Sequence, residues 1–72
     1  VAALTGNVAL VDGAPFIHAH AVLSRCDDSL SCIGAHIKSA RVAVTLEIVL
    51  TATAEPLVRA RDESVGLNLI TL

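Results

Sequence analysis

The sequence predicts a small domain built mainly of an antiparallel β-sheet. Apolar and polar residues alternate along several stretches of the 72-residue chain, and such alternation is typical of strands. Asp12-Gly13 lies between two of these stretches and is a strong signal for a tight hairpin turn. No segment has the 3.6-residue apolar period of an amphipathic helix, so any helix of the complete domain is expected outside this segment.

The expected strands follow one another along the chain, with short turns or loops between them. Pro15 comes just before the second strand, where the first residue needs no amide donor. A loop at Asp62–Gly66 precedes the last strand. In chain order, the expected strands are Asn7–Val11, Phe16–Ser24, Cys32–Ile37, Val42–Thr53, Pro56–Arg61 (a strand or a helical turn) and Leu67–Leu72.

The apolar content is high for a domain of this size. Hydrophobic residues make up 54% of the chain, the mean hydropathy is +0.73, and Phe16 is the only aromatic residue. A domain this small has a large surface relative to its volume and cannot bury all of these side chains by itself. Either a partner subunit covers part of them or the chain is a piece of a larger domain, and a first residue of Val agrees with truncation. We expect a truncated or minimal domain that assembles with others.

Charge and hydropathy argue against two kinds of partner. The formal net charge is −2 and the basic residues are scattered, so the chain offers no basic stripe for a phosphate backbone and no aromatic platform for bases. The most apolar run, Val42–Ala54, is interrupted by Glu47 and is far too short to span a bilayer. The pattern of a signal peptide is also missing, so a cytoplasmic location without a membrane partner is expected.

The chain has three histidines, His18, His20 and His36, in one compact constellation. His18 and His20 are two residues apart, so on a strand both imidazoles point to the same face. His36 comes from the next stretch, shortly after Gly34, which permits a bend or a close approach of the backbone. Three convergent imidazoles with room for a water are typical of an open zinc site, although such ligands also suit nickel or iron. The alternative is three core or interface histidines that are hydrogen-bonded to the backbone or to one another.

The other residues that could carry chemistry give weaker signals. Cys26 and Cys32 bracket a polar loop, and we expect reduced, structural cysteines, because no secretory context supports a disulfide and the spacing is not that of a metal or redox pair. Glu47 interrupts an apolar strand, which makes it the candidate general base, but the same pattern fits a solvated residue on an exposed face. A salt-linked surface or subunit contact is expected of Arg59, Arg61 and Asp62.

A series of short motifs in a fixed order carries a family resemblance. The series consists of Gly6-Asn7, Asp12-Gly13, Pro15-Phe16, His18-Ala19-His20, Gly34-Ala35-His36, Thr45-Leu46-Glu47, and Arg61-Asp62 with Gly66-Leu67. It resembles the plants-and-prokaryotes-conserved domain, abbreviated PPC or PCC, which occurs alone in prokaryotes and behind AT-hook DNA-binding motifs in plants. The resemblance makes residues 1–72 a partial PPC-like domain that corresponds to the later part of the family's domain.

The resemblance implies properties that the residues alone do not. It implies an α+β fold with a mainly antiparallel β-sheet, whose N-terminal strand and helix region is missing from this chain, and a homo-oligomer, with a trimer favoured. It also implies zinc at the three histidines, because some members bind zinc there. Two departures from the family stand out: Ala35 replaces the second glycine of the usual Gly-Gly-His, and the AT-hook core Arg-Gly-Arg is absent.

Two functions from different classes follow from these observations. The first is an oligomerising interaction module of the type associated with DNA-binding proteins, which holds a metal at three histidines and meets DNA only indirectly or weakly. The second is a small zinc-dependent lyase or hydrolase whose site resembles that of acetolactate decarboxylase, with Glu47 as acid or base. The sequence leans toward the non-enzymatic module, since no second polar group is evident near the histidines.

Overall fold

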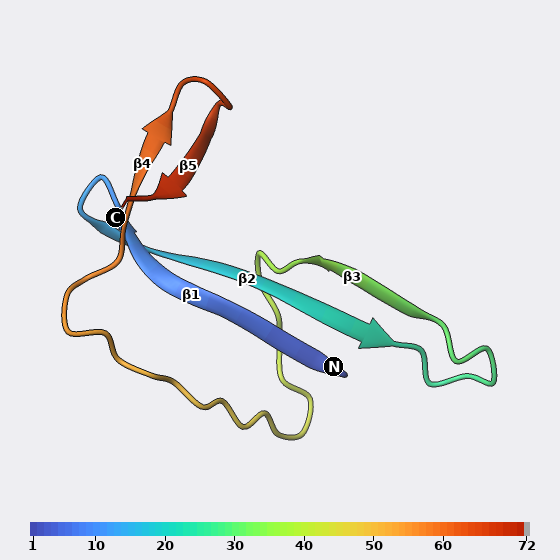
Figure 1. Ribbon diagram of the computed structural model, residues 1–72. Helices are drawn as coiled ribbons and strands as arrows, with labels where there is room; N and C mark the ends of the chain where they lie inside the picture. Colours follow the sequence, from blue (N-terminus) through green and yellow to red (C-terminus); the bar gives the residue numbers. More distant parts are fainter. Residues whose placement is uncertain (72) are drawn as a thin grey trace. The chain divides into compact units, whose positions relative to one another are not determined.

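The computed structural model describes residues 1–71 as five strands and their connections (Figure 1). The strands are β1 (Ala3–Val11), β2 (Ala14–Ser24), β3 (Cys32–His36), β4 (Val58–Asp62) and β5 (Leu67–Ile70). Hydrogen bonds join them in the order β3-β2-β1-β4-β5. The chain divides into two compact units: unit 1 contains residues 1–7 and 17–40, and unit 2 contains residues 8–16 and the chain from residue 41.

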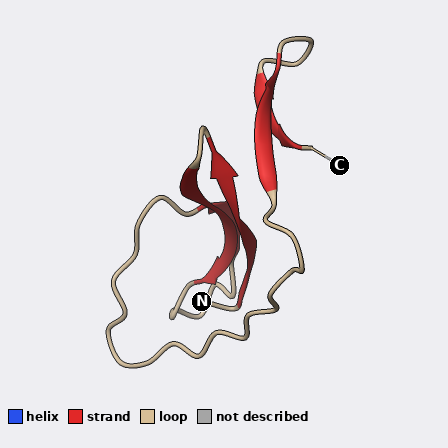
Figure 2. Cartoon of the chain, turned by 90° about the vertical axis from the view of Figure 1, so that its left-hand side faces the viewer, coloured by secondary structure: helices blue, strands red, loops and turns tan. Residues whose placement is uncertain are grey.

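The expected α+β fold class is wrong for this chain. Residues 1–71 are all β, with five strands and no helix, as Figure 2 shows by the absence of helical ribbon. The physical reason is the two-residue period of the apolar positions, which suits a pleated strand and offers no continuous stripe along a helix. Strand pairing is antiparallel for β2 with β3 and for β4 with β5, and parallel for β1 with β4.

The hairpin predicted at Asp12-Gly13 is confirmed. β1 ends at Val11 and β2 begins at Ala14, so the turn has two residues. The φ angles are 50° at Asp12 and 78° at Gly13. Two consecutive positive φ angles are what a tight hairpin turn matched to the strand twist requires, and Asp-Gly is among the few pairs that adopt them readily.

Unit 1 is built around the second half of β2. Its partner β3 is antiparallel, with His20 opposite His36 and Ser24 opposite Cys32. The Ala2 N–H donates to the Val22 carbonyl at 2.8 Å, which ties the start of the chain to the same strand. The methyl groups of Ala19 and Ala21 are buried, whereas the large apolar side chains of this strand stay partly exposed. The backbone ladder therefore fixes which β2 residues face β3.

Unit 2 contains the hairpin of β4 and β5. The register runs from Arg59 opposite Ile70 to Asp62 opposite Leu67. Gly66 has a φ of 70° and its N–H donates to the Asp62 carbonyl at 2.8 Å, which closes the turn. The strands expected at Pro56–Arg61 and Leu67–Leu72 are confirmed in outline, although Leu72 itself lies outside the described residues.

The Asp62 carboxylate stabilises this turn through hydrogen bonds with Ser64, so the stability of the turn should depend on pH. It accepts hydrogen bonds from the Ser64 hydroxyl and from the Ser64 N–H, and these bonds hold the pKa of Asp62 below its ordinary value of 3.8. Because the pKa of Asp62 is lowered, its charged carboxylate stabilises the turn fully at pH values above the ordinary pKa. This stabilisation is lost as the pH falls through the lowered pKa. We expect Ser64→Ala to raise the pKa of Asp62, measured by NMR titration of its carboxyl carbon. An unchanged titration curve would show that the Ser64 hydroxyl has no such role.

The strand expected at Val42–Thr53 is absent, and this prediction was wrong. Residues 42–53 form no strand, and their apolar side chains are exposed, with Val44 at 93% and Val49 at 95%. Alternation marks side chains that suit a half-buried pleated surface, but a strand also needs a neighbour for its backbone hydrogen bonds. Within residues 1–71 no strand pairs with this stretch, so the pattern alone does not produce the structure.

Residues 1–71 contain no helix that is long and apolar enough to cross a membrane.

Candidate metal centre

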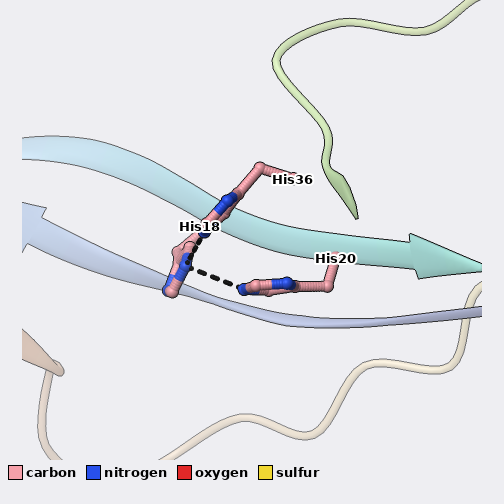
Figure 3. A group of neighbouring side chains, drawn as sticks. All are labelled: His18, His20 and His36. Carbon is pink, nitrogen blue, oxygen red and sulfur yellow. Dashed lines mark hydrogen bonds between the residues drawn. The ribbon is translucent and has the colours of Figure 1, made fainter. Parts of the chain in front are cut away.

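The three histidines come together on one face of β2 and β3. His18 and His20 share that face because they are two residues apart on β2, and His36 lies opposite His20 in the β2–β3 register. All three side chains belong to unit 1. Figure 3 shows the rings of His18, His20 and His36 turned toward one another. The predicted convergence is therefore confirmed, and it follows from strand parity and register.

The ring nitrogens approach at distances that a metal ion would span. The His18 Nε2 lies 2.9 Å from the His36 Nε2 and 3.2 Å from the His20 Nε2. The ligand atoms of the group all lie within 4.8 Å of one another. Two nitrogens that bind one zinc tetrahedrally at their usual bond length are about 3.3 Å apart. The two short spacings are close to this value, so the three residues fit a metal without a large rearrangement.

The His18 Nε2 takes part in both hydrogen bonds of the cluster, and the tautomer of each ring decides which nitrogen donates. A given Nε2 of a neutral imidazole either carries a proton and donates, or carries a lone pair and accepts. The His18 Nε2 makes both short contacts, so one proton or one lone pair on it is shared between the His20 and His36 rings. A metal ion accepts a lone pair from each of the three rings. His18 is half-buried, whereas His20 and His36 are exposed, so the cluster is open to solvent on one side.

The donor set consists of nitrogen alone. Among residues 1–71, the group of potential ligand atoms contains the three histidines and no carboxylate or thiolate. Cys26 and Cys32 are free and exposed, near the loop that joins β2 to β3. Three neutral imidazoles suit zinc, and they also suit nickel or iron, so the set fits a divalent first-row metal.

Ala35 is accommodated without strain beside the cluster. It lies in β3 opposite Ala21 and is not among the residues with positive φ. A methyl group is acceptable at any ordinary strand position, so the departure from the family's Gly-Gly-His does not displace His36 from its place opposite His20.

An open hollow adjoins the histidine cluster within unit 1. Its volume is about 410 Å³, and His20 and His36 are the two histidines that line it. The remaining lining side chains are small or apolar, apart from one hydroxyl. They are Ala3, Leu4, Thr5, Ala21, Val22, Gly34 and Ala35.

Unit 2 contains the four charged residues singled out in the sequence, Glu47, Arg59, Arg61 and Asp62. Glu47 is exposed, on the stretch that forms no strand, and its role as a general base stays a prediction. The Arg59 guanidinium donates to the Asn68 carbonyl at 3.0 Å, and the Arg61 guanidinium lies 3.6 Å from the Glu63 carboxylate. These contacts stabilise the β4–β5 hairpin and its turn, and none of them includes a histidine.

One residue that positions the site was not singled out for that role from the sequence. A Cβ at Gly6 would lie 2.8 Å from the Ala19 Cα and closer still to the His18 carbonyl oxygen, so β1 approaches β2 closely behind His18. The available signal was a glycine inside a strand, which often marks close approach of another backbone.

An all-β chain with three convergent histidines on neighbouring strands is a candidate metal-binding domain. Residues 1–54 match the family model described as the Plants and Prokaryotes Conserved (PCC) domain, and this range contains all three histidines. The chain belongs to the PCC domain family. No curated protein and no solved structure matches the chain.

Proposed function

We propose that this chain is an oligomerising PCC-domain module that binds one metal ion through His18, His20 and His36, with zinc favoured. The observation that carries the proposal is the convergence of three ring nitrogens, with 2.9 Å and 3.2 Å between neighbouring Nε2 atoms. A zinc ion at such a site supplies a Lewis acid and lowers the pKa of a bound water. The chain's own contribution is to place His20 opposite His36 by the β2–β3 register and His18 on the same face two residues before His20.

Metal content tests the first part of this proposal. We expect the purified protein to hold about one equivalent of zinc by elemental analysis, and to rebind zinc or cobalt(II) after chelation. Cobalt(II) should give the intense visible absorption of a four-coordinate site, since three histidines leave room for one further ligand. A protein that holds and rebinds no divalent metal would contradict the proposed metal site.

Self-association rests on how little of the apolar surface this chain buries. The buried hydrophobic residues of the described chain are Ala9, Ala19 and Ala21, all of them alanines, whereas large apolar side chains are exposed throughout. Exposed apolar surface of this extent is typical of protein interfaces rather than of monomers. A homo-oligomer that covers these side chains removes the imbalance, and the family resemblance favours a trimer.

Sedimentation of the protein tests the oligomer. We expect a species larger than the monomer at micromolar concentration, and we expect Val49→Asp to shift the equilibrium toward monomer, because Val49 is 95% exposed in the single chain. Ser39→Asp adds the same charge at an exposed polar position and serves as the control. A wild-type protein that sediments as a monomer at 50 μM would contradict this proposal.

Association with DNA is proposed to be indirect. The net charge of −2 gives the chain no electrostatic attraction for a duplex. DNA would therefore be bound by a partner that is attached to this chain covalently or non-covalently. Direct binding of an AT-rich duplex by this chain at low salt would argue against this view.

The zinc-dependent lyase or hydrolase is the second candidate. The open hollow beside His20 and His36 favours it, because a substrate needs access to the metal. We place it second, since the lining residues other than the histidines carry no acid or base. If turnover is detected, Glu47→Gln should abolish it; retained turnover would exclude Glu47 as the acid or base.

A further inference from the structure

We propose that the hollow beside the histidine cluster binds short-chain aliphatic carboxylates, with the carboxylate on the metal and the hydrocarbon chain over the sheet. This inference rests on the metal site proposed above. The hollow is formed by residues of β1, β2 and β3, and all of them belong to unit 1. Its volume of about 410 Å³ is within the range of small-molecule sites.

The lining of the hollow selects for hydrocarbon. Apart from the two histidines, Thr5 is the only lining residue with a polar side chain. Gly34 leaves room at the centre of the β3 side: a Cβ there would meet only the Ala21 carbonyl oxygen, at 3.9 Å. Gly34 and His36 lie on the same face of β3, because they are two residues apart. An alkyl chain that starts at the metal would therefore run over Gly34.

The charge of the loaded site selects for an anion. Three neutral imidazoles leave the two positive charges of a divalent metal uncompensated, and no lining residue is acidic. The acidic residues of unit 1 are Asp27 and Asp28. Asp27 is already paired with the Arg25 guanidinium at 2.7 Å and accepts hydrogen bonds from Ser29. An external carboxylate can supply the missing negative charge directly at the metal.

A carboxylate fits this site better than a phosphate group. Phosphate recognition depends on several converging donors, typically arginine, lysine or backbone N–H groups. The hollow is lined by no arginine or lysine, so a phosphate ester would leave most of its oxygens without partners. A monocarboxylate can take the one remaining position at the metal through a carboxylate oxygen and leave its second oxygen to solvent, so it needs no further donors.

The experiment is a chain-length series on the zinc-loaded protein. Acetate, butyrate, hexanoate and hexan-1-ol are titrated by calorimetry, and the cobalt(II) form is followed by visible absorption. Burying each methylene in a half-open apolar hollow should strengthen binding about twofold, so hexanoate, with four more methylenes, should bind roughly 16-fold more tightly than acetate. Hexan-1-ol, which has the chain without the charge, should bind far more weakly and leave the cobalt(II) spectrum unchanged.

A cavity-filling variant locates the bound chain. A Cβ at Gly34 meets no atom closer than 3.9 Å, so we expect Gly34→Leu to fill part of the hollow and to remove the preference for hexanoate over acetate while zinc affinity is retained. Ser24→Leu adds the same side chain to β2 outside the hollow and should keep the preference.

The outcomes separate this inference from the metal site. A protein that binds no metal overturns both proposals. The protein could bind zinc and show equal affinity for acetate and hexanoate, or bind hexan-1-ol as tightly as hexanoate. Either result would leave the metal site standing and overturn the carboxylate site. The wild-type series distinguishes these outcomes whether or not Gly34→Leu folds.

Discussion

Replacing His18 with alanine is expected to lower zinc affinity by about 100-fold or more. The His18 Nε2 lies 2.9 Å from one partner nitrogen and 3.2 Å from the other, so it is the central ligand of the three. Its loss leaves His20 and His36, and two imidazoles hold zinc much more weakly than three. Competition with a chromophoric chelator measures the change in affinity.

The same variant should lose the stabilisation that zinc provides. A ligand at 100 times its dissociation constant stabilises the folded state by about 2.7 kcal/mol, which raises the melting temperature of a domain this small by about 10 °C or more. We expect this rise for the wild type and little or none for His18→Ala. Val22→Ala is the matched control, because Val22 lies on the same face of β2 and is not a potential ligand. Wild-type zinc affinity in His18→Ala would exclude the three-histidine centre.

The sequence predicted those features that depend on local rules. The Asp12-Gly13 turn follows from residues that tolerate positive φ, and the structure has φ values of 50° and 78° there. The convergence of His18 and His20 follows from the two-residue period of a strand. His36 was expected nearby, but its place opposite His20 depends on the register of β3, which no local pattern specifies.

The features that were predicted wrongly depend on pairing between distant segments. Val42–Thr53 has the alternation of a strand and forms none, since backbone pairing needs a second segment at the right place. The α+β class came from the family resemblance, and residues 1–71 have no helix. The alternation correctly predicted the β character of most other segments, so the pattern was informative about local conformation and uninformative about partners.

The start of the first strand was placed too late, for a related reason. The expected strand began at Asn7, whereas β1 begins at Ala3 and includes Gly6. A glycine weakens a strand when only its intrinsic preference is considered. At this position the close approach of β2 outweighs that preference, because a side chain would meet the neighbouring backbone.

Replacing Gly6 with alanine is therefore expected to destabilise the protein by about 2 kcal/mol, the typical cost of overpacking. The new Cβ would lie 2.8 Å from the Ala19 Cα and closer still to the His18 carbonyl oxygen, and backbone atoms of a paired strand cannot move aside cheaply. Alanine loses less chain entropy on folding than glycine, by about 0.5–1 kcal/mol, so the clash is the larger effect. Urea denaturation measures the net change.

A glycine on the neighbouring strand provides the control for this prediction. Gly34→Ala puts the same methyl group into β3, where the nearest atom is 3.9 Å away, so its stability should equal or slightly exceed that of the wild type. Because the clash at Gly6 falls on the backbone of His18, Gly6→Ala should also weaken zinc binding, whereas Gly34→Ala should not. If Gly6→Ala matched Gly34→Ala in both stability and zinc affinity, the close approach of β1 to β2 would not be what positions His18.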